Sequence, residues 1–131
     1  MKSYTDIEQS KKLAEILPVE SADMHYSKDF DGSWFIDLAE YTSVKIPQYV
    51  DNVEEHLLPC WSLAALLDYM HKVDLFPDIT DFNGEFKLVV SYVNEEEEKI
   101  LGNVQTIISR NENLIDGCVE MIVKLHEQKL L

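Results

Sequence analysis

The side chains with the widest chemical repertoire in this 131-residue chain are two cysteines and four histidines. A thiolate beside an imidazole base forms a nucleophilic site, and the same residue types bind zinc when they occur at short, repeated spacings. The histidines are far apart in the sequence, at positions His25, His56, His71 and His126. The closest ligand-like pair is His56 with Cys60, but Pro59 lies between them and no second pair completes four ligands. We therefore expect no metal and no cofactor.

Cys60 and Cys118 each lie in an apolar stretch with a helical pattern. In a reducing compartment such cysteines usually serve as small buried hydrophobes, and we expect that state here. A disulfide or a reactive thiol remains the alternative, and a cysteine that meets a histidine only in the fold would make the protein a small hydrolase or transferase. The chain has no Gly-x-Ser-x-Gly elbow, glycine-rich phosphate loop or paired CxxC element. No catalytic residue is therefore assigned.

The segment Asp29-Phe30-Asp31-Gly32 has carboxylates at a spacing that calcium loops use. If Gly32 took the sixth position of such a loop, the twelfth would be Leu38, where a calcium loop needs a bidentate glutamate. The Asp-Gly pair favours a tight reversal instead, because glycine adopts the positive φ angles of hairpin turns. We predict a hairpin with strands over residues 24–30 and 33–38, and a weak divalent-cation site is the alternative.

The chain has 25 acidic and 11 basic residues, which give a formal net charge of -14 at pH 7. Much of the excess lies in residues 18–59, where 9 acids face 2 bases. Binding to nucleic-acid phosphates or to anionic lipid needs clustered lysine and arginine, so we expect no direct nucleic-acid partner and no membrane partner. The sequence has no signal-peptide-like apolar leader and no apolar stretch of about 20 residues, so we expect a cytoplasmic protein.

Aromatic residues gather in the same acidic third of the chain, at Tyr26, Phe30, Trp34, Phe35, Tyr41 and Tyr49. Alternate residues of a strand face the core, and the remaining aromatics, rimmed by carboxylates, are typical of a protein-binding surface. The run Glu95 to Glu98 is either a solvated loop or helix start, or a docking surface for a basic partner. The candidate interaction surface is Asp29, Asp31, Trp34, Tyr41, Glu95, Glu96, Glu97 and Glu98.

The most apolar segment, residues 59–70, predicts a central helix that must be enclosed because its apolar side chains point in nearly every direction. Thr5 followed by Glu8 is a capping-box pattern, and it predicts a first helix that ends at Pro18. Residues 41–58 have no clean period and are expected to form a connection with a short helical turn near residues 52–56.

Alternation over residues 86–92 predicts a strand. Residues 94–103 are expected to form a loop before a second strand, and a last amphipathic helix is predicted from about residue 114 to 128. These elements give an α+β class, with three helices packed on a small, mainly antiparallel sheet in the order helix, hairpin, helix, hairpin, helix. The length suits one core, so residues 1–131 are expected to form a single domain.

Three blocks of sequence form a specific combination: residues 5–17 with Glu20-Ser21-Ala22-Asp23-Met24, then Pro59-Cys60-Trp61-Ser62-Leu63-Ala64-Ala65-Leu66-Leu67, then residues 114–122 with Lys124-Leu125-His126-Glu127. Together they cover roughly a third of the chain, and they resemble a family of small uncharacterised proteins common in gut bacteria and their phages or mobile elements. The resemblance implies a phage-linked cytosolic role and brings no activity, cofactor or catalytic residue. Gly117 stands where the family pattern has alanine, a better helix former.

The leading hypothesis is a non-enzymatic protein-interaction module, an accessory or inhibitory factor that presents its acidic middle third to a basic protein partner. A sharper form of this hypothesis has the acidic surface imitate a nucleic acid and occupy the DNA groove of a host protein. The alternatives are a small hydrolase or transferase with a Cys/His site and a protein that associates with itself. The sequence leaves the oligomeric state open.

Overall fold

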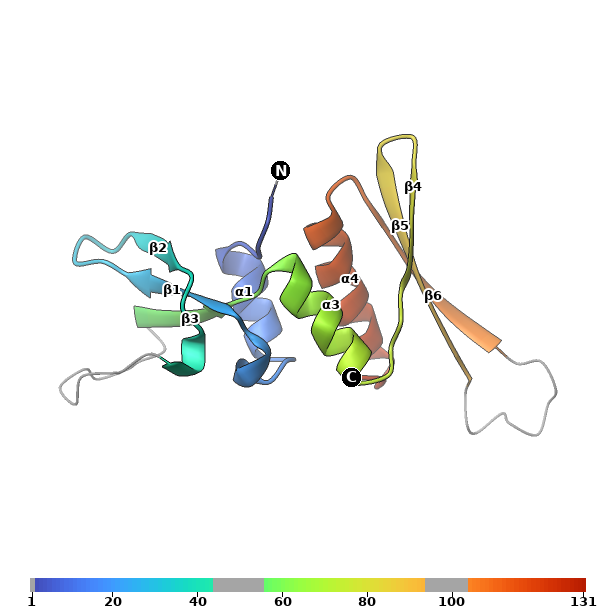
Figure 1. Cartoon of the computed structure of the whole chain (residues 1–131), viewed down its shortest axis with the longest axis horizontal. Helices are drawn as coiled ribbons and strands as arrows, with labels where there is room; N and C mark the ends of the chain where they lie inside the picture. Colours follow the sequence, from blue (N-terminus) through green and yellow to red (C-terminus); the bar gives the residue numbers. More distant parts are fainter. Residues whose placement is uncertain (1, 44–55, 94–103) are drawn as a thin grey trace. The chain divides into compact units, whose positions relative to one another are not determined.

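The computed structural model describes residues 2–43, 56–93 and 104–131. Within these ranges the chain forms three α-helices and six β-strands, and the strands make two antiparallel three-stranded sheets (Figure 1). The predicted α+β class is confirmed. The single sheet and the predicted order are wrong in detail, because each expected hairpin has a third strand. The order is helix, three strands, helix, three strands, helix.

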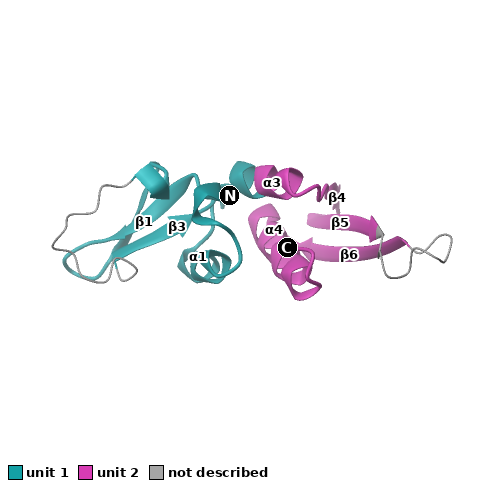
Figure 2. Cartoon of the chain, turned by 90° about the horizontal axis from the view of Figure 1, so that it is seen from below, with its two compact units in different colours: residues 1–66 teal, residues 67–131 magenta. Residues whose placement is uncertain are grey.

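The chain divides into two compact units, residues Met1–Leu66 (unit 1) and Leu67–Leu131 (unit 2) (Figure 2). Unit 1 contains α1 (Ile7–Ala14), η1 (Val19–Ser21), β1 (Met24–Lys28), β2 (Trp34–Asp37), η2 (Tyr41–Ser43) and β3 (Leu57–Cys60). Unit 2 contains β4 (Asp78–Phe82), β5 (Glu85–Val93), β6 (Val104–Asn111) and α4 (Leu114–Glu127). The boundary falls inside α3 (Leu63–Lys72).

The sheet of unit 1 has β1 in the centre, with β2 and β3 antiparallel on either side. Alternation along β1 sends Met24 and Tyr26 to one face, where they form a buried cluster with Leu58 and Cys60 of β3. α1 packs against β3 and contributes the partly buried Ile7 to this cluster. The core of unit 1 therefore lies between α1 and the inner face of its sheet.

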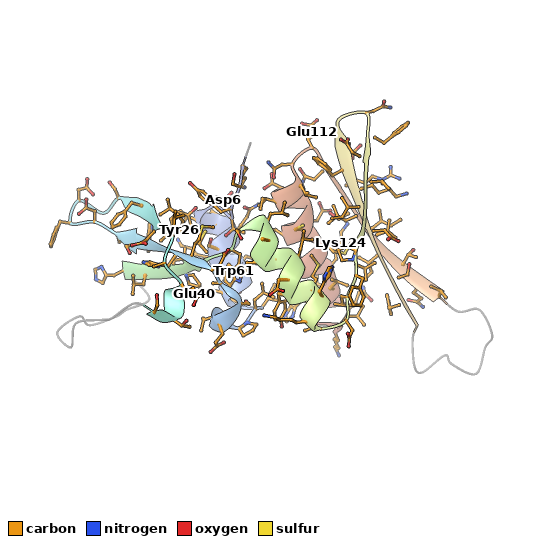
Figure 3. The ribbon with its side chains drawn as sticks, in the orientation of Figure 1. Asp6, Tyr26, Glu40, Trp61, Glu112 and Lys124 are labelled. Atoms are coloured by element: carbon orange, nitrogen blue, oxygen red, sulfur yellow. The ribbon has the colours of Figure 1, made fainter. Side chains whose placement is uncertain are left out.

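The first helix is capped one residue later than predicted. Asp6, labelled in Figure 3, is the N-cap. Its Oδ1 accepts from Gln9 N at 2.8 Å, and Asp6 N donates to Gln9 Oε1 at 3.1 Å. Thr5, the predicted cap, is fully buried instead. Its Oγ1 lies 2.8 Å from Ser10 Oγ and accepts from Trp61 N at 3.2 Å. The predicted capping box is displaced because the Thr5 hydroxyl is used in a tertiary contact.

The predicted central helix over residues 59–70 starts too early. β3 occupies Leu57–Cys60, and α3 begins at Leu63. Pro59 pairs with His25 of β1, and because β3 is an edge strand, proline removes no bond from the interior of the sheet. The helix start is marked by Ser62, whose Oγ accepts from Ala65 N at 3.1 Å.

Burial divides α3 into two faces. Leu66 and Met70 are fully buried, as is Trp61 just before the helix, whereas Ala64 and Asp68 are exposed. The enclosure expected from the sequence therefore applies to one face of the helix, and the other face meets solvent.

The sheet of unit 2 has β5 in the centre, between β4 and β6. α4 packs against β5 and β6, over the buried side chains of Leu88, Val90 and Ser109. The strand predicted over residues 86–92, the strand after residue 103 and the last helix are confirmed. β4 was not predicted, because all five of its residues are exposed and leave no apolar alternation. The predictions for residues 44–55 and 94–103 lie outside the described residues.

Gly117 lies in the first turn of α4, where the helix approaches β5. A Cβ atom at this position would lie 2.9 Å from Leu88 Cδ1, which is closer than two carbon atoms pack. Ser109 Oγ also donates a hydrogen bond to Gly117 O at 3.0 Å. Glycine therefore permits the close approach of helix and sheet, although its helix propensity is poor.

We predict that Gly117→Ala lowers the free energy of unfolding by about 1 kcal/mol, because displacement of the buried Leu88 side chain outweighs the gain in helix propensity. In a Leu88→Ala background the same substitution is expected to raise the free energy of unfolding, since the obstructing methyl group is gone. Urea unfolding of the four proteins, followed by circular dichroism, measures both effects. Equal effects of Gly117→Ala in the two backgrounds would contradict the close packing.

Candidate functional site

The β1–β2 hairpin ends in a turn of residues 29–33, which we call the hairpin tip. Asp29 N donates to Ser33 O at 2.8 Å, and Gly32 N donates to Asp29 O at 2.9 Å. Gly32 has a φ of 85°, in the left-handed region that favours glycine. The hairpin predicted from Asp31-Gly32 is thereby confirmed.

The two carboxylates of the hairpin tip are bonded into the turn. Asp29 Oδ1 accepts from Phe30 N at 2.8 Å, and Asp31 Oδ1 accepts from Ser33 N at 2.9 Å. The Ser33 N–H holds the pKa of Asp31 below its usual range. Both side chains are exposed, so the tip presents two negative charges whose positions are fixed by backbone contacts.

The residue between these two aspartates in the sequence, Phe30, has an exposed aromatic side chain. Phe30 has a relative exposure of 108%, the highest among the exposed large hydrophobic side chains of the described residues. Phe35 and Leu38, on the second strand and just after it, have exposures of 50% and 77%. Large apolar side chains that are exposed on an acidic hairpin are typical of a contact surface for another protein.

The described residues of the predicted surface have different settings in the structure. Asp29 and Asp31 lie together in the hairpin tip, but Trp34 is half-buried against the core cluster of unit 1. Lys28 Nζ lies 5.5 Å from the centroid of the Trp34 ring, within range of a cation–π interaction. Tyr41 is half-buried and begins η2, and Glu95 to Glu98 fall outside the described residues.

Three exposed residues of the hairpin, Phe30, Phe35 and Leu38, were not predicted as part of the candidate surface. Alternation supplied a signal for Phe35, because it follows Trp34 on β2 and must face away from the core when Trp34 faces it. Phe30 was detectable from its place before Gly32, since a side chain inside a tight turn has no sheet neighbour to cover it.

The turn uses the oxygens that a weak cation site would need. One oxygen of each tip carboxylate already accepts a backbone N–H, from Phe30 or from Ser33. Over residues 2–43, 56–93 and 104–131, no group of three His, Cys, Asp or Glu side chains is placed to hold a metal ion.

The buried His25 of β1 contacts the end of β2 and the chain that follows it. Its side chain is 3% exposed, and its Nδ1 lies 2.7 Å from Ala39 O, a distance at which an Nδ1–H tautomer donates to the carbonyl. Nε2 lies 3.8 Å from Asp37 Oδ2. These contacts fasten the chain after β2 to the central strand, and they account for the buried imidazole.

Both thiols are free and buried. Cys60 Sγ lies 3.5 Å from Thr5 Oγ1 and from Thr5 O, and burial raises its pKa. Burial raises the pKa of Cys118 to about 12. Among the described residues, neither thiol is hydrogen-bonded to a histidine. A protonated, enclosed thiol is a poor nucleophile, so the geometry gives no support to the Cys/His hydrolase alternative.

Comparisons with protein-family models, with curated proteins and with solved structures find no match to this chain. Among the helices that the structure describes, none has the length and apolar content needed to cross a membrane. The candidate site therefore rests on the geometry of the hairpin.

We predict that Cys60 and Cys118 do not react with a disulfide reagent in the folded protein at about pH 8 and that both react in denaturant. Their folded pKa values lie above the ordinary value of 9.0, so the unfolded state loses these protons first, and the free energy of unfolding should fall as the pH rises above that value. An absorbance assay with the disulfide reagent measures the reactivity of the cysteines. Urea titrations at alkaline pH measure the change in the free energy of unfolding. Reaction in the folded state at the rate of a free thiol would contradict this burial.

Proposed function

We propose that this protein is a non-enzymatic interaction module that binds a basic protein surface through the hairpin tip. The observation that carries the proposal is the full exposure of Phe30, which lies in the sequence between two aspartates whose carboxylates are hydrogen-bonded into the turn. Aromatic anchors that enter a pocket on the partner account for much of the energy of protein interfaces. The matching partner has an apolar pocket rimmed by lysine or arginine.

The rigidity of the turn supports this role. Four backbone N–H groups of residues 29–33 donate within the turn, two of them to carboxylates. A ring presented on an ordered turn needs less ordering on binding, so less of the interaction energy is lost to conformational entropy.

The surrounding charge supports a basic partner. Residues 18–59 contain 9 acids and 2 bases, and one of those bases, Lys28, lies over the Trp34 ring. The negative potential around the hairpin would speed the approach of a positively charged protein and weaken with added salt. The resemblance to proteins of gut bacteria and their phages or mobile elements extends the proposal to an accessory or inhibitory factor acting in the cytoplasm.

We predict that Phe30→Ala weakens binding by about tenfold or more, because the anchor is removed without disturbing the core. Tagged protein is used to capture partners from a bacterial lysate at low and high salt, and the affinity for each captured protein is then measured. Phe76→Ala is the matched control, since Phe76 is also exposed, at 60%, but lies in unit 2. Equal binding by wild type and Phe30→Ala would refute the proposal.

The contribution of charge is tested by Asp29→Asn with Asp31→Asn. Asparagine keeps a side-chain oxygen that can accept the Phe30 and Ser33 N–H groups, so the turn is preserved while two charges are removed. We predict weaker binding at low salt and a smaller dependence of affinity on salt concentration. An unchanged salt dependence would show that the partner does not respond to the carboxylates.

A further inference from the structure

Two cations lie side by side on the face of the unit 2 sheet that is turned away from α4. Lys87 of β5 pairs directly with Arg110 of β6. The residues next to them, Leu88 and Ser109, point toward α4 and are buried, so alternation directs Lys87 and Arg110 to the opposite face. Like charges directly opposite each other on neighbouring strands destabilise a sheet.

Most other basic residues that the structure describes form ion pairs, whereas these two cations do not. Ion pairs form between Lys2 and Asp6, Lys11 and Glu8, Lys72 and Asp68, and Lys124 and Glu120. Within the described residues, neither Lys87 nor Arg110 has an ion-pair partner, although the chain has 25 acidic residues. Their charges are therefore available to a group from outside.

Lys87 and Arg110 line one surface hollow of about 470 Å³, together with Thr80, Asp81, Phe82 and Glu85. Phe82 is 74% exposed, so the hollow offers an aromatic ring beside the two cations. The formal charges of its lining cancel, with two bases and two acids. On a chain of net charge -14, this balanced surface is one that an acidic group can approach without strong repulsion.

We propose that the hollow binds the hairpin tip of a second copy of this chain. Phe30 of one copy would pack against Phe82 of the other, and the two tip carboxylates would lie against Lys87 and Arg110. This inference rests on the proposed function of the hairpin tip, and it names as the partner surface a hollow that contains two cations. The two surfaces are complementary. The tip has an exposed phenylalanine between two aspartates in the sequence, and the hollow has another exposed phenylalanine together with two cations that form no ion pair among the described residues.

Such a contact is heterologous, because it joins two different surfaces of the same chain. It is also small, since a hairpin tip covers much less than the roughly 800 Å² per partner of a standard interface. Two copies of net charge -14 repel each other, and salt screens that repulsion. The association is therefore weak, depends on protein concentration and is best observed at physiological ionic strength or above.

Complementation between two defective variants tests the proposal. Phe30→Ala keeps the hollow and loses the anchor, whereas Lys87→Glu with Arg110→Glu keeps the tip and loses the cations. Each variant is expected to stay monomeric in sedimentation equilibrium up to about 1 mM, where the mass of the wild type rises. Mixed together, they are expected to form a one-to-one complex through the remaining intact tip and the remaining intact hollow. Circular dichroism of each variant confirms that it is folded.

Isotope labelling locates the contact in the same mixture. When labelled Phe30→Ala is titrated with the unlabelled Lys87→Glu, Arg110→Glu variant, amide shifts are expected at residues 80–87 and at Arg110, and none at the labelled tip. A wild type that stays monomeric, or folded variants that fail to complement, would overturn the inference. If lysate capture through Phe30 persists in that case, the proposed function stands alone; if Phe30→Ala changes neither experiment, both proposals fail.

Discussion

The fully buried Thr5 holds unit 1 together, because its hydroxyl and its backbone join three elements at one point. Its Oγ1 bonds to Ser10 of α1 and to Trp61 N, and its N donates to Trp61 O at 3.0 Å. Tyr26 of β1 donates its hydroxyl to Thr5 O at 2.7 Å. A buried polar group without a partner is costly, and no buried side-chain N or O atom in the described residues lacks one. The helix, the central strand and the end of β3 are thus fixed together.

The hydrogen bonds around Thr5 also support the base of the β1–β2 hairpin. β1 leaves the network at Tyr26 and reaches the tip three residues later, so the base of the hairpin is held by buried bonds while its end is held by the turn. The half-buried Trp34 and the His25 contacts add support along the strands. An exposed ring on such a support keeps its position, which is the property that a binding anchor needs.

The elements that the sequence predicted correctly are those whose signals are local. Asp31-Gly32 marked the hairpin, and alternation marked the strand over residues 86–92. Two local signals were misleading because a tertiary contact decides the role of the residue. Thr5 has the residue type of a helix cap but is used in the core, and Pro59 resembles a helix start but pairs with β1 at a sheet edge. β4 gave no signal because its side chains are all exposed.

The candidate site shows the same division. The acidic turn was found from its composition, because Asp29 and Asp31 flank the reversal. Trp34 was assigned to the candidate surface but packs half-buried against the core cluster, and Phe35, which was not assigned, is exposed. Nothing local says which of two neighbouring aromatics faces the core. That choice is made by the register of β2 on β1, in which Trp34 pairs with Lys28 and Phe35 with Ser27. Register is a property of the assembled sheet, so the sequence of β2 alone does not specify it.

Among the described strands, β4 forms one edge of the unit 2 sheet, and this edge affects how copies of the chain can meet. The edge strand of a sheet can pair with a strand of another chain, which can lead to aggregation. Proteins commonly prevent this with charged side chains on the edge. β4 is five residues long and carries Asp78 and Asp81, so a β4 strand of a second copy added in parallel register would bring carboxylates against carboxylates. Growth by strand addition is thereby discouraged, and docking onto this sheet is left to side chains on its face.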